Sequence, residues 1–244
     1  MKPRDLKERL NGVGWFIPPY VSSDFLGLVA SRIAQAQGNF TQDDLEKALS
    51  FVYDAERLAS MILYRYRCMP VIKQFTETIS ESVAAHFFGL GHVAVGGLIP
   101  VIEGAGRLLA VDRRIKSRGS IKNVFEALAS YAKKDVKGRR IGATDEIVDM
   151  LDSFICFVQD YFYSDSQLYP LGDGTNRPGI LHGAYTDSEY GKPINFYKTI
   201  AAVDFLTFIS SLNTPTMSGF APERTSDSSR LAAHYVSLRA KNTP

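Results

Sequence analysis

An arginine and a histidine lie at a short, fixed spacing within residues 176–183, which read Asn-Arg-Pro-Gly-Ile-Leu-His-Gly. Arg177 carries a permanent positive charge, and His182, five positions later, can exchange a proton near neutral pH. A histidine that moves a proton and an arginine that stabilises charge developing on phosphorus together suit phosphodiester chemistry. Arg177 and His182 are therefore the primary candidates for catalytic residues.

The proline inside this segment constrains its local geometry. Pro178 has no N–H group and a fixed φ, so it suits the first turn of a helix and favours an extended Arg177. We expect a short helix that begins at Pro178, with Arg177 just outside it and His182 about one turn in. The free N–H groups at such an end suit an anion, and Asn176 adds a polar amide.

The spacing resembles the Arg-x4-His signature of the HEPN superfamily, which consists of all-α proteins that include many metal-independent endoribonucleases. The whole segment, with Tyr190-Gly191 after it, is similar to a bacterial branch that reads Asn-Arg-x-x-Ile-Leu-His-Gly, then Tyr-Gly, then a final apolar helix. A second matching piece is Pro-Val-Ile-Glu-Gly at 100–104, followed by Arg107. Both pieces lie within residues 85–212. Pro178 departs from the pattern, because active members usually carry a polar residue there.

The resemblance implies that RNA is cleaved by its own 2′-hydroxyl at a site formed by a homodimer, with no metal or cofactor. His182 would then act as base or acid, and Arg177 would stabilise the phosphorane. Toxin, phage-defence and RNA-processing roles are all compatible with this chemistry. The predicted catalytic set also includes Asn176 and Glu103, and the residues predicted to contact RNA are Arg107, Arg113, Arg114 and Tyr190.

Two alternatives concern the same residues. Glu103 can pair with Arg107 four positions later on one helix, or orient Arg177 or His182 from a neighbouring helix, and the spacing does not decide between them. The motif can also be catalytically silent, in a HEPN-like module that binds a nucleotide, RNA or a protein partner, or it can only stabilise a dimer. Pro178 favours the silent alternative.

The elements that position these residues are predicted to be helices, because no alternating strand pattern persists. We expect an all-α bundle with an N-terminal helical extension (1–70), a HEPN-like core (71–212), and a C-terminal loop and helix (213–244). The C-terminal helix docks on the body or on a protein partner. The expected helices cover 3–11, 22–38, 42–69, 71–88, 87–102, from 120, from 144, 193–212 with one apolar stripe, and 227–241; residues 15–20 form an extended strap.

Residues 87–102 are apolar on nearly all sides, yet they fall short of the roughly 20 residues that cross a bilayer, and Pro100 interrupts them. We therefore predict a buried central helix of a soluble protein rather than a membrane span. Two basic runs flank the helix that begins at 120, and they either end helices or face a nucleic-acid backbone. They comprise Arg113, Arg114, Lys116 and Arg118, then Lys133, Lys134, Lys137, Arg139 and Arg140.

Composition sets wider limits. The 244 residues carry a formal net charge of +2, so a nucleic-acid partner must be met by local patches. Cys68 and Cys156 have no ligand-like spacing and are predicted to be buried thiols in a reducing compartment. The histidines show no metal-site spacing either, and no apolar run follows the N-terminus. We expect a cytoplasmic protein without a metal centre.

Overall fold

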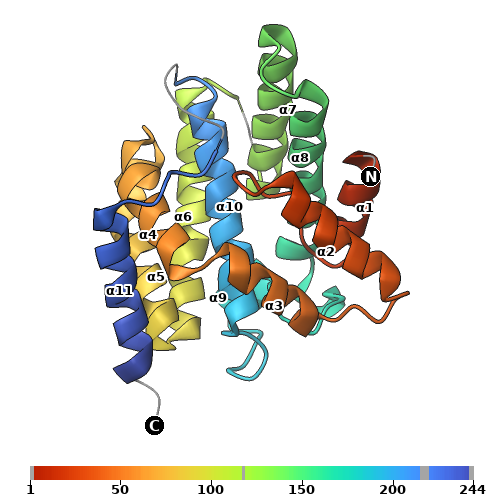
Figure 1. Cartoon of the computed structure of the whole chain (residues 1–244). Coiled ribbons are helices and arrows are strands. Elements are labelled where there is room, and N and C mark those ends of the chain that lie inside the picture. Colours follow the sequence, from red (N-terminus) through yellow and green to blue (C-terminus); the bar gives the residue numbers. More distant parts are fainter. Residues whose placement is uncertain (1–2, 117–118, 215–219, 242–244) are drawn as a thin grey trace.

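Helices make up the regular structure of this protein, as expected for an all-α chain. The computed structural model describes residues 3–116, 119–214 and 220–241, and these residues form no strand (Figure 1). The α-helices are α1 (Pro3–Gly12), α2 (Ser23–Gln35), α3 (Gln42–Val52), α4 (Ala55–Tyr64), α5 (Thr76–Phe88), α6 (Gly91–Asp112), α7 (Ile121–Arg139), α8 (Thr144–Phe157), α9 (Arg177–Leu181), α10 (Pro193–Ser211) and α11 (Ser226–Lys241). Shorter helical turns are η1 (Tyr66–Cys68), η2 (Ile72–Phe75), the π-helical η3 (Val158–Phe162) and η4 (Ser166–Leu168).

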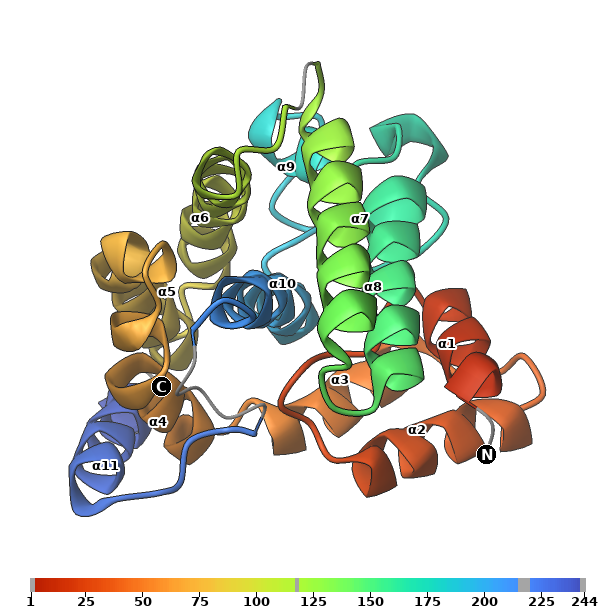
Figure 2. The same ribbon diagram turned by 90° about the horizontal axis from the view of Figure 1, so that it is seen from above.

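Helix α10 lies at the centre of the molecule. Both views place it between α5 and α6 on one side and α7 and α8 on the other (Figures 1 and 2). Every residue from Ile194 to Ser211 is buried, so the prediction of a single apolar stripe is wrong. A helix surrounded on all sides must also bury its polar residues, and Lys198 and Asp204 therefore need partners inside the protein.

The apolar stretch near residue 90 divides into two helices. Gly89 ends α5 in the left-handed conformation (φ 87°), and α6 begins at Gly91 and continues through Pro100. α6 is long and apolar enough to cross a membrane by composition alone, but 56% of its most apolar window is buried in the protein. This burial is consistent with a core helix of a soluble protein. The central position predicted for it belongs to α10 instead.

The single long helix predicted for 42–69 is also wrong, because the chain breaks between α3 and α4. Tyr53 leaves helical geometry (φ −99°, ψ 48°), and the Asp54 side chain accepts a hydrogen bond of 2.7 Å from the Arg57 N–H. Aspartate satisfies a free N–H group best at a helix start, so this cap favours a new helix over continuation. Residues 71–88 are likewise divided between η2 and α5.

The three predicted regions share one hydrophobic core, which extends from Leu10 to Tyr235. The strap buries Trp15 and Phe16 as expected, and the Phe16 ring lies 5.1 Å from that of Phe154. α11 packs on α4 and α5, where Tyr235 stacks on Phe87 with 5.4 Å between ring centroids. The prediction for the cysteines is wrong, since Cys68 is exposed and Cys156 is half-buried.

Candidate active site

Asn176 fixes the start of the motif. α9 begins at Arg177, one residue earlier than predicted, and the Asn176 side chain caps it by accepting from the Gly179 N–H at 2.8 Å. Its amide nitrogen donates to the carbonyls of Tyr161 and Ser164, both at 3.0 Å. Asn176 is fully buried, so its side chain positions the motif and does not reach solvent. One of the N–H groups at this helix start, that of Gly179, is therefore bonded to the cap rather than free for an anion.

A buried ion pair anchors the loop that leads into the motif. Lys198 of α10 and Asp173 of the loop lie 2.8 Å apart, and both are almost fully shielded from solvent. Tyr169 donates to the same carboxylate, and Asn195 donates to the Asp173 carbonyl at 2.6 Å. Burial acts to raise the pKa of Asp173, but the Lys198 charge and the hydrogen bonds that the carboxylate accepts hold that pKa below its usual value. The loop is therefore fixed to the central helix.

Arg177 links Glu103 and His182. Its Nε donates to Glu103 Oε1 at 2.7 Å, and its Nη1 lies 2.9 Å from His182 Nε2. Because a guanidinium group has only donors, His182 Nε2 accepts, and the ring proton of the neutral imidazole then belongs on Nδ1. His182 is exposed, whereas the Arg177 and Glu103 side chains are 22% and 19% accessible. The ion pair is partly buried and the imidazole is open to a ligand.

Tyr163 also forms a hydrogen bond with the Glu103 carboxylate. Its hydroxyl donates to Glu103 Oε1 at 3.2 Å, from the residue that directly follows the π-helical turn η3. Burial, together with the Glu103 charge, raises the pKa of Tyr163 well above its ordinary value, so the hydroxyl remains a neutral donor. The sequence analysis did not single out this tyrosine. Nothing in its spacing pointed to Glu103, which is 60 residues away.

Of the two predicted partners of Glu103, the structure shows the contact with Arg177. Among the described residues, no ion pair joins Glu103 to Arg107, which lies exposed one turn further along α6. Tyr190 sits in the loop after the motif, where its ring meets His92 edge-on at 4.7 Å. That loop approaches α6 so closely that a Cβ at Gly91 would lie 1.8 Å from the Gly191 carbonyl oxygen.

The two basic runs meet at the C-terminal end of α10. Arg113 donates to the carbonyls of Ile209 and Ser210, at 3.4 and 3.2 Å, and Arg139 donates to the Leu212 carbonyl. Cations at a helix C-terminus bond the free carbonyls and match the helix dipole. Arg114 and Lys116 are exposed, and Arg118 lies outside the described residues. Two residues of these runs, Arg113 and Arg139, therefore stabilise the end of α10, while others such as Arg114 and Lys116 are exposed.

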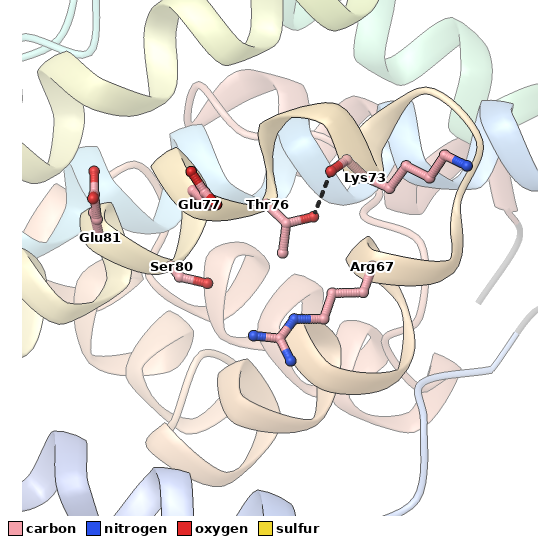
Figure 3. Close-up of a pocket in the computed structure, with 6 residues that line it drawn as sticks. All are labelled: Arg67, Lys73, Thr76, Glu77, Ser80 and Glu81. Atoms are coloured by element: carbon pink, nitrogen blue, oxygen red, sulfur yellow. Dashed lines mark hydrogen bonds between the residues drawn. The ribbon is translucent and has the colours of Figure 1, made fainter.

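Two hollows lie elsewhere and contain none of the predicted site residues. The larger, of about 430 Å³, is lined by Arg67, Lys73, Thr76, Glu77, Ser80 and Glu81 (Figure 3). Its cations and carboxylates balance, so it has no charge preference for a substrate. The smaller, of about 380 Å³, lies at the junction of α3 and α4. Within the described residues, no group of three or more His, Cys, Asp or Glu side chains could hold a metal ion.

Comparisons with protein-family models, with curated proteins and with solved structures found no match. The functional argument therefore depends on the residues of the motif and on their geometry. That geometry combines a guanidinium group held by a carboxylate with an exposed imidazole beside it. Three of the five Arg177 N–H groups are directed at Glu103 and His182, which leaves others for an anionic ligand.

Proposed function

We propose that this protein is a metal-independent endoribonuclease. The observation that carries the proposal is the 2.9 Å contact between Arg177 Nη1 and His182 Nε2 beside the Glu103 ion pair. An arginine and an imidazole in contact at an accessible site can bind one phosphodiester and exchange its protons. The HEPN-like pattern of residues 176–183 supports RNA as the substrate and the cytoplasm as the compartment.

The proposed reaction is an internal transesterification. A phosphate that binds the Arg177 guanidinium would compete with His182 for Nη1 and free Nε2 to take the proton of the 2′-hydroxyl. The new 2′-O–P bond forms as the P–O5′ bond breaks, and the leaving 5′-oxygen takes up a proton. Arg177 stabilises the phosphorane, while Glu103 and Tyr163 hold Arg177 in place. The products are a 2′,3′-cyclic phosphate and a 5′-hydroxyl.

We further propose that two copies of the chain combine their motifs in a homodimer. One His182 in a single site would have to accept the proton from the 2′-hydroxyl and also deliver a proton to the leaving oxygen. Two histidines divide these tasks, which is the usual arrangement in acid–base catalysis of this kind. Two exposed cations are then proposed to contact the RNA backbone: Arg107, one turn beyond Glu103 on α6, and Arg114, just after the end of α6.

A second candidate function is a catalytically silent module that binds a nucleotide, an RNA end or a protein partner. Two observations favour it: Pro178 occupies the first turn of α9, and Arg177 is already engaged by both Glu103 and His182. This candidate predicts binding without turnover, and it predicts that Arg177→Ala abolishes that binding.

The first prediction separates these candidates. Purified wild-type, Arg177→Ala and His182→Ala proteins are incubated with total bacterial RNA and tRNA in EDTA, and the product ends are sequenced. We expect cleavage by the wild type only, with cyclic phosphate or 3′-phosphate ends. His234→Ala is the matched control, because His234 is an exposed histidine on α11. Equal cleavage by His182→Ala would overturn the proposal, and binding without cleavage by the wild type would establish the silent module.

A further inference from the structure

Helix α6 exposes an apolar side, which faces away from α5 and α10 (Figure 2). Val93 is 61% exposed, Val111 is 74% exposed, and Pro100 between them is also exposed. These positions are separated by about two and three helical turns, so they lie on one side of the helix. Leu108, 36% exposed, borders the same side. This side of α6, from Val93 to Val111, is the α6 face.

The α6 face has few of the charged residues that normally keep a helix surface in water. From Gly91 to Ile102, α6 contains no Asp, Glu, Lys or Arg, and the exposed Arg107 lies at one edge of the face. The neighbouring helix α5, by contrast, exposes Glu77 and Glu81. Exposed apolar patches on soluble proteins usually mark a contact surface. The composition of the α6 face therefore points to a partner.

Gly96 leaves room for a second helix against this face. It lies between Val93 and Pro100 on the same side of α6, and a Cβ there would meet no atom of another element within 4 Å. Gly97 differs, because a Cβ there would lie 2.4 Å from the Ser82 hydroxyl of α5. Gly97 is thus needed for packing within the chain, whereas Gly96 faces open space. A small residue on a helix surface permits a close approach of another helix.

The position of Glu103 makes a second copy of the chain the partner that fits. A two-fold axis passes through the middle of a symmetric interface, so groups near the middle lie close to their symmetry mates. Glu103 lies one residue past the midpoint between Val93 and Val111, and it holds Arg177 at 2.7 Å. An apolar patch can also face its own copy without repulsion between like charges.

We propose that this protein dimerises through the α6 faces of two copies, packed in antiparallel directions. This inference rests on the proposed function, which requires two motifs in one site. Glu103 is about 80° around the helix from Val93, so it lies at one flank of the face. Antiparallel packing puts both Arg177–His182 pairs on the same side of the paired helices, whereas parallel packing would put them on opposite sides.

The elements beside the motif extend the apolar surface. Leu181 of α9 is 39% exposed and Leu168 of η4 is 77% exposed. α9 contacts both α6 and η4, so these leucines belong to the elements that flank the α6 face. They would add apolar area on the side where the two motifs meet.

The first test measures association by sedimentation velocity without RNA. We expect a dimer for the full chain at micromolar concentration, and Val93→Glu should raise its dissociation constant by about tenfold or more, because one substitution puts two carboxylates into the interface. Leu28→Glu is the matched control, since Leu28 is 52% exposed on α2, far from α6 (Figure 2), and it should associate as the wild type does. Both side chains are exposed, so both variants should keep the wild-type melting temperature.

Disulfide cross-linking tests the antiparallel arrangement. The background is Cys68→Ser, because Cys68 is exposed. Pro100→Cys lies close to the two-fold axis and should link two copies under oxidising conditions. Val111→Cys should not, because its two copies would lie about 27 Å apart along the paired helices, beyond the reach of a disulfide.

A wild type that stays monomeric overturns the inference, and so does a Val93→Glu variant that dimerises with wild-type affinity. A monomer that binds phosphatidylcholine vesicles would assign the face to a membrane instead. Linkage through Val111→Cys but not through Pro100→Cys overturns the antiparallel arrangement. Because association is measured without RNA, a dimer that cleaves no RNA contradicts the proposed ribonuclease but keeps this interface, whereas an active monomer does the reverse.

Discussion

At the scale of single residues, the central feature is one guanidinium group shared by a carboxylate and an imidazole. The Arg177–Glu103 ion pair is about one-fifth exposed on each side, and partly solvated pairs contribute only about 1 kcal/mol or less to the free energy of folding. The pair therefore matters for orientation more than for stability. It fixes the direction of Arg177, and the Tyr163 hydroxyl fixes Glu103 in turn.

This distinction gives the second prediction. Glu103→Gln removes the charge that holds Arg177, so we expect kcat for RNA cleavage to fall about tenfold or more, while the free energy of unfolding changes by less than about 1 kcal/mol. Glu81→Gln is the matched control, because Glu81 is exposed on α5 away from the motif. Cleavage kinetics and urea unfolding measure the two quantities. If both variants cleave equally well, Glu103 does not position the arginine.

At the scale of elements, the motif is held by two structures that precede it, the π-helical turn η3 and the loop 165–176. Asn176 connects them, since its amide bonds the carbonyls of Tyr161 and Ser164 while its oxygen caps α9. A five-residue helix is too short to be stable alone. The position of Arg177 and His182 therefore depends on this one buried side chain.

The third prediction compares two helix caps. Thr41→Ala removes an exposed cap of α3 and should cost about 1 kcal/mol. Asn176→Ala removes a cap and also leaves two partly buried carbonyls without their donor, so we expect a loss of about 2–4 kcal/mol. Urea unfolding of both variants gives the comparison. Equal losses would show that the Tyr161 and Ser164 carbonyls find other partners.

At the scale of the whole molecule, burial of α10 on all sides makes stability depend on pH. Asp204 is fully buried, and burial raises its pKa from 3.8 to about 6 even though Arg57 and the Tyr66 hydroxyl act to lower it. The folded protein thus holds this proton more tightly than the unfolded chain does. Between pH 4 and 6 the folded state binds more protons, so this contribution to stability is lost as pH rises. The Arg65 charge also lowers the pKa of Asp204, and the Asp204 charge in turn raises the pKa values of Tyr20 and Tyr53.

The fourth prediction follows from that sign. Asp204→Asn cannot titrate, so the unfolding free energy of the wild type minus that of the variant should fall by about 2 kcal/mol between pH 4 and 7, at about 1.4 kcal/mol for each pKa unit. Carboxylates with lowered pKa values, such as Asp173, act in the opposite direction but are shared by both proteins and cancel. Denaturant unfolding across this range measures the difference. A constant or rising difference would contradict the raised pKa.

The sequence by itself determined the local features. The all-α class, the extended strap, the start of a helix at the motif and the neighbourhood of Arg177 and His182 all depend on residues a few positions apart. Proline geometry, capping side chains and apolar spacing act over that range, so their effects can be predicted from the sequence. The break at Asp54 was equally local, but the apolar spacing that continues across it concealed the cap.

The tertiary structure alone decided the rest. Glu103 meets Arg177 across 74 residues, Tyr163 meets Glu103 across 60, and Lys198 meets Asp173 across 25. These pairs depend on which helix faces which, and on the depth at which each side chain is buried. The all-round burial of α10 has the same origin, because a helix cannot show in its own sequence how many neighbours will surround it. Side-chain contacts between distant helices are fixed only when the whole core packs.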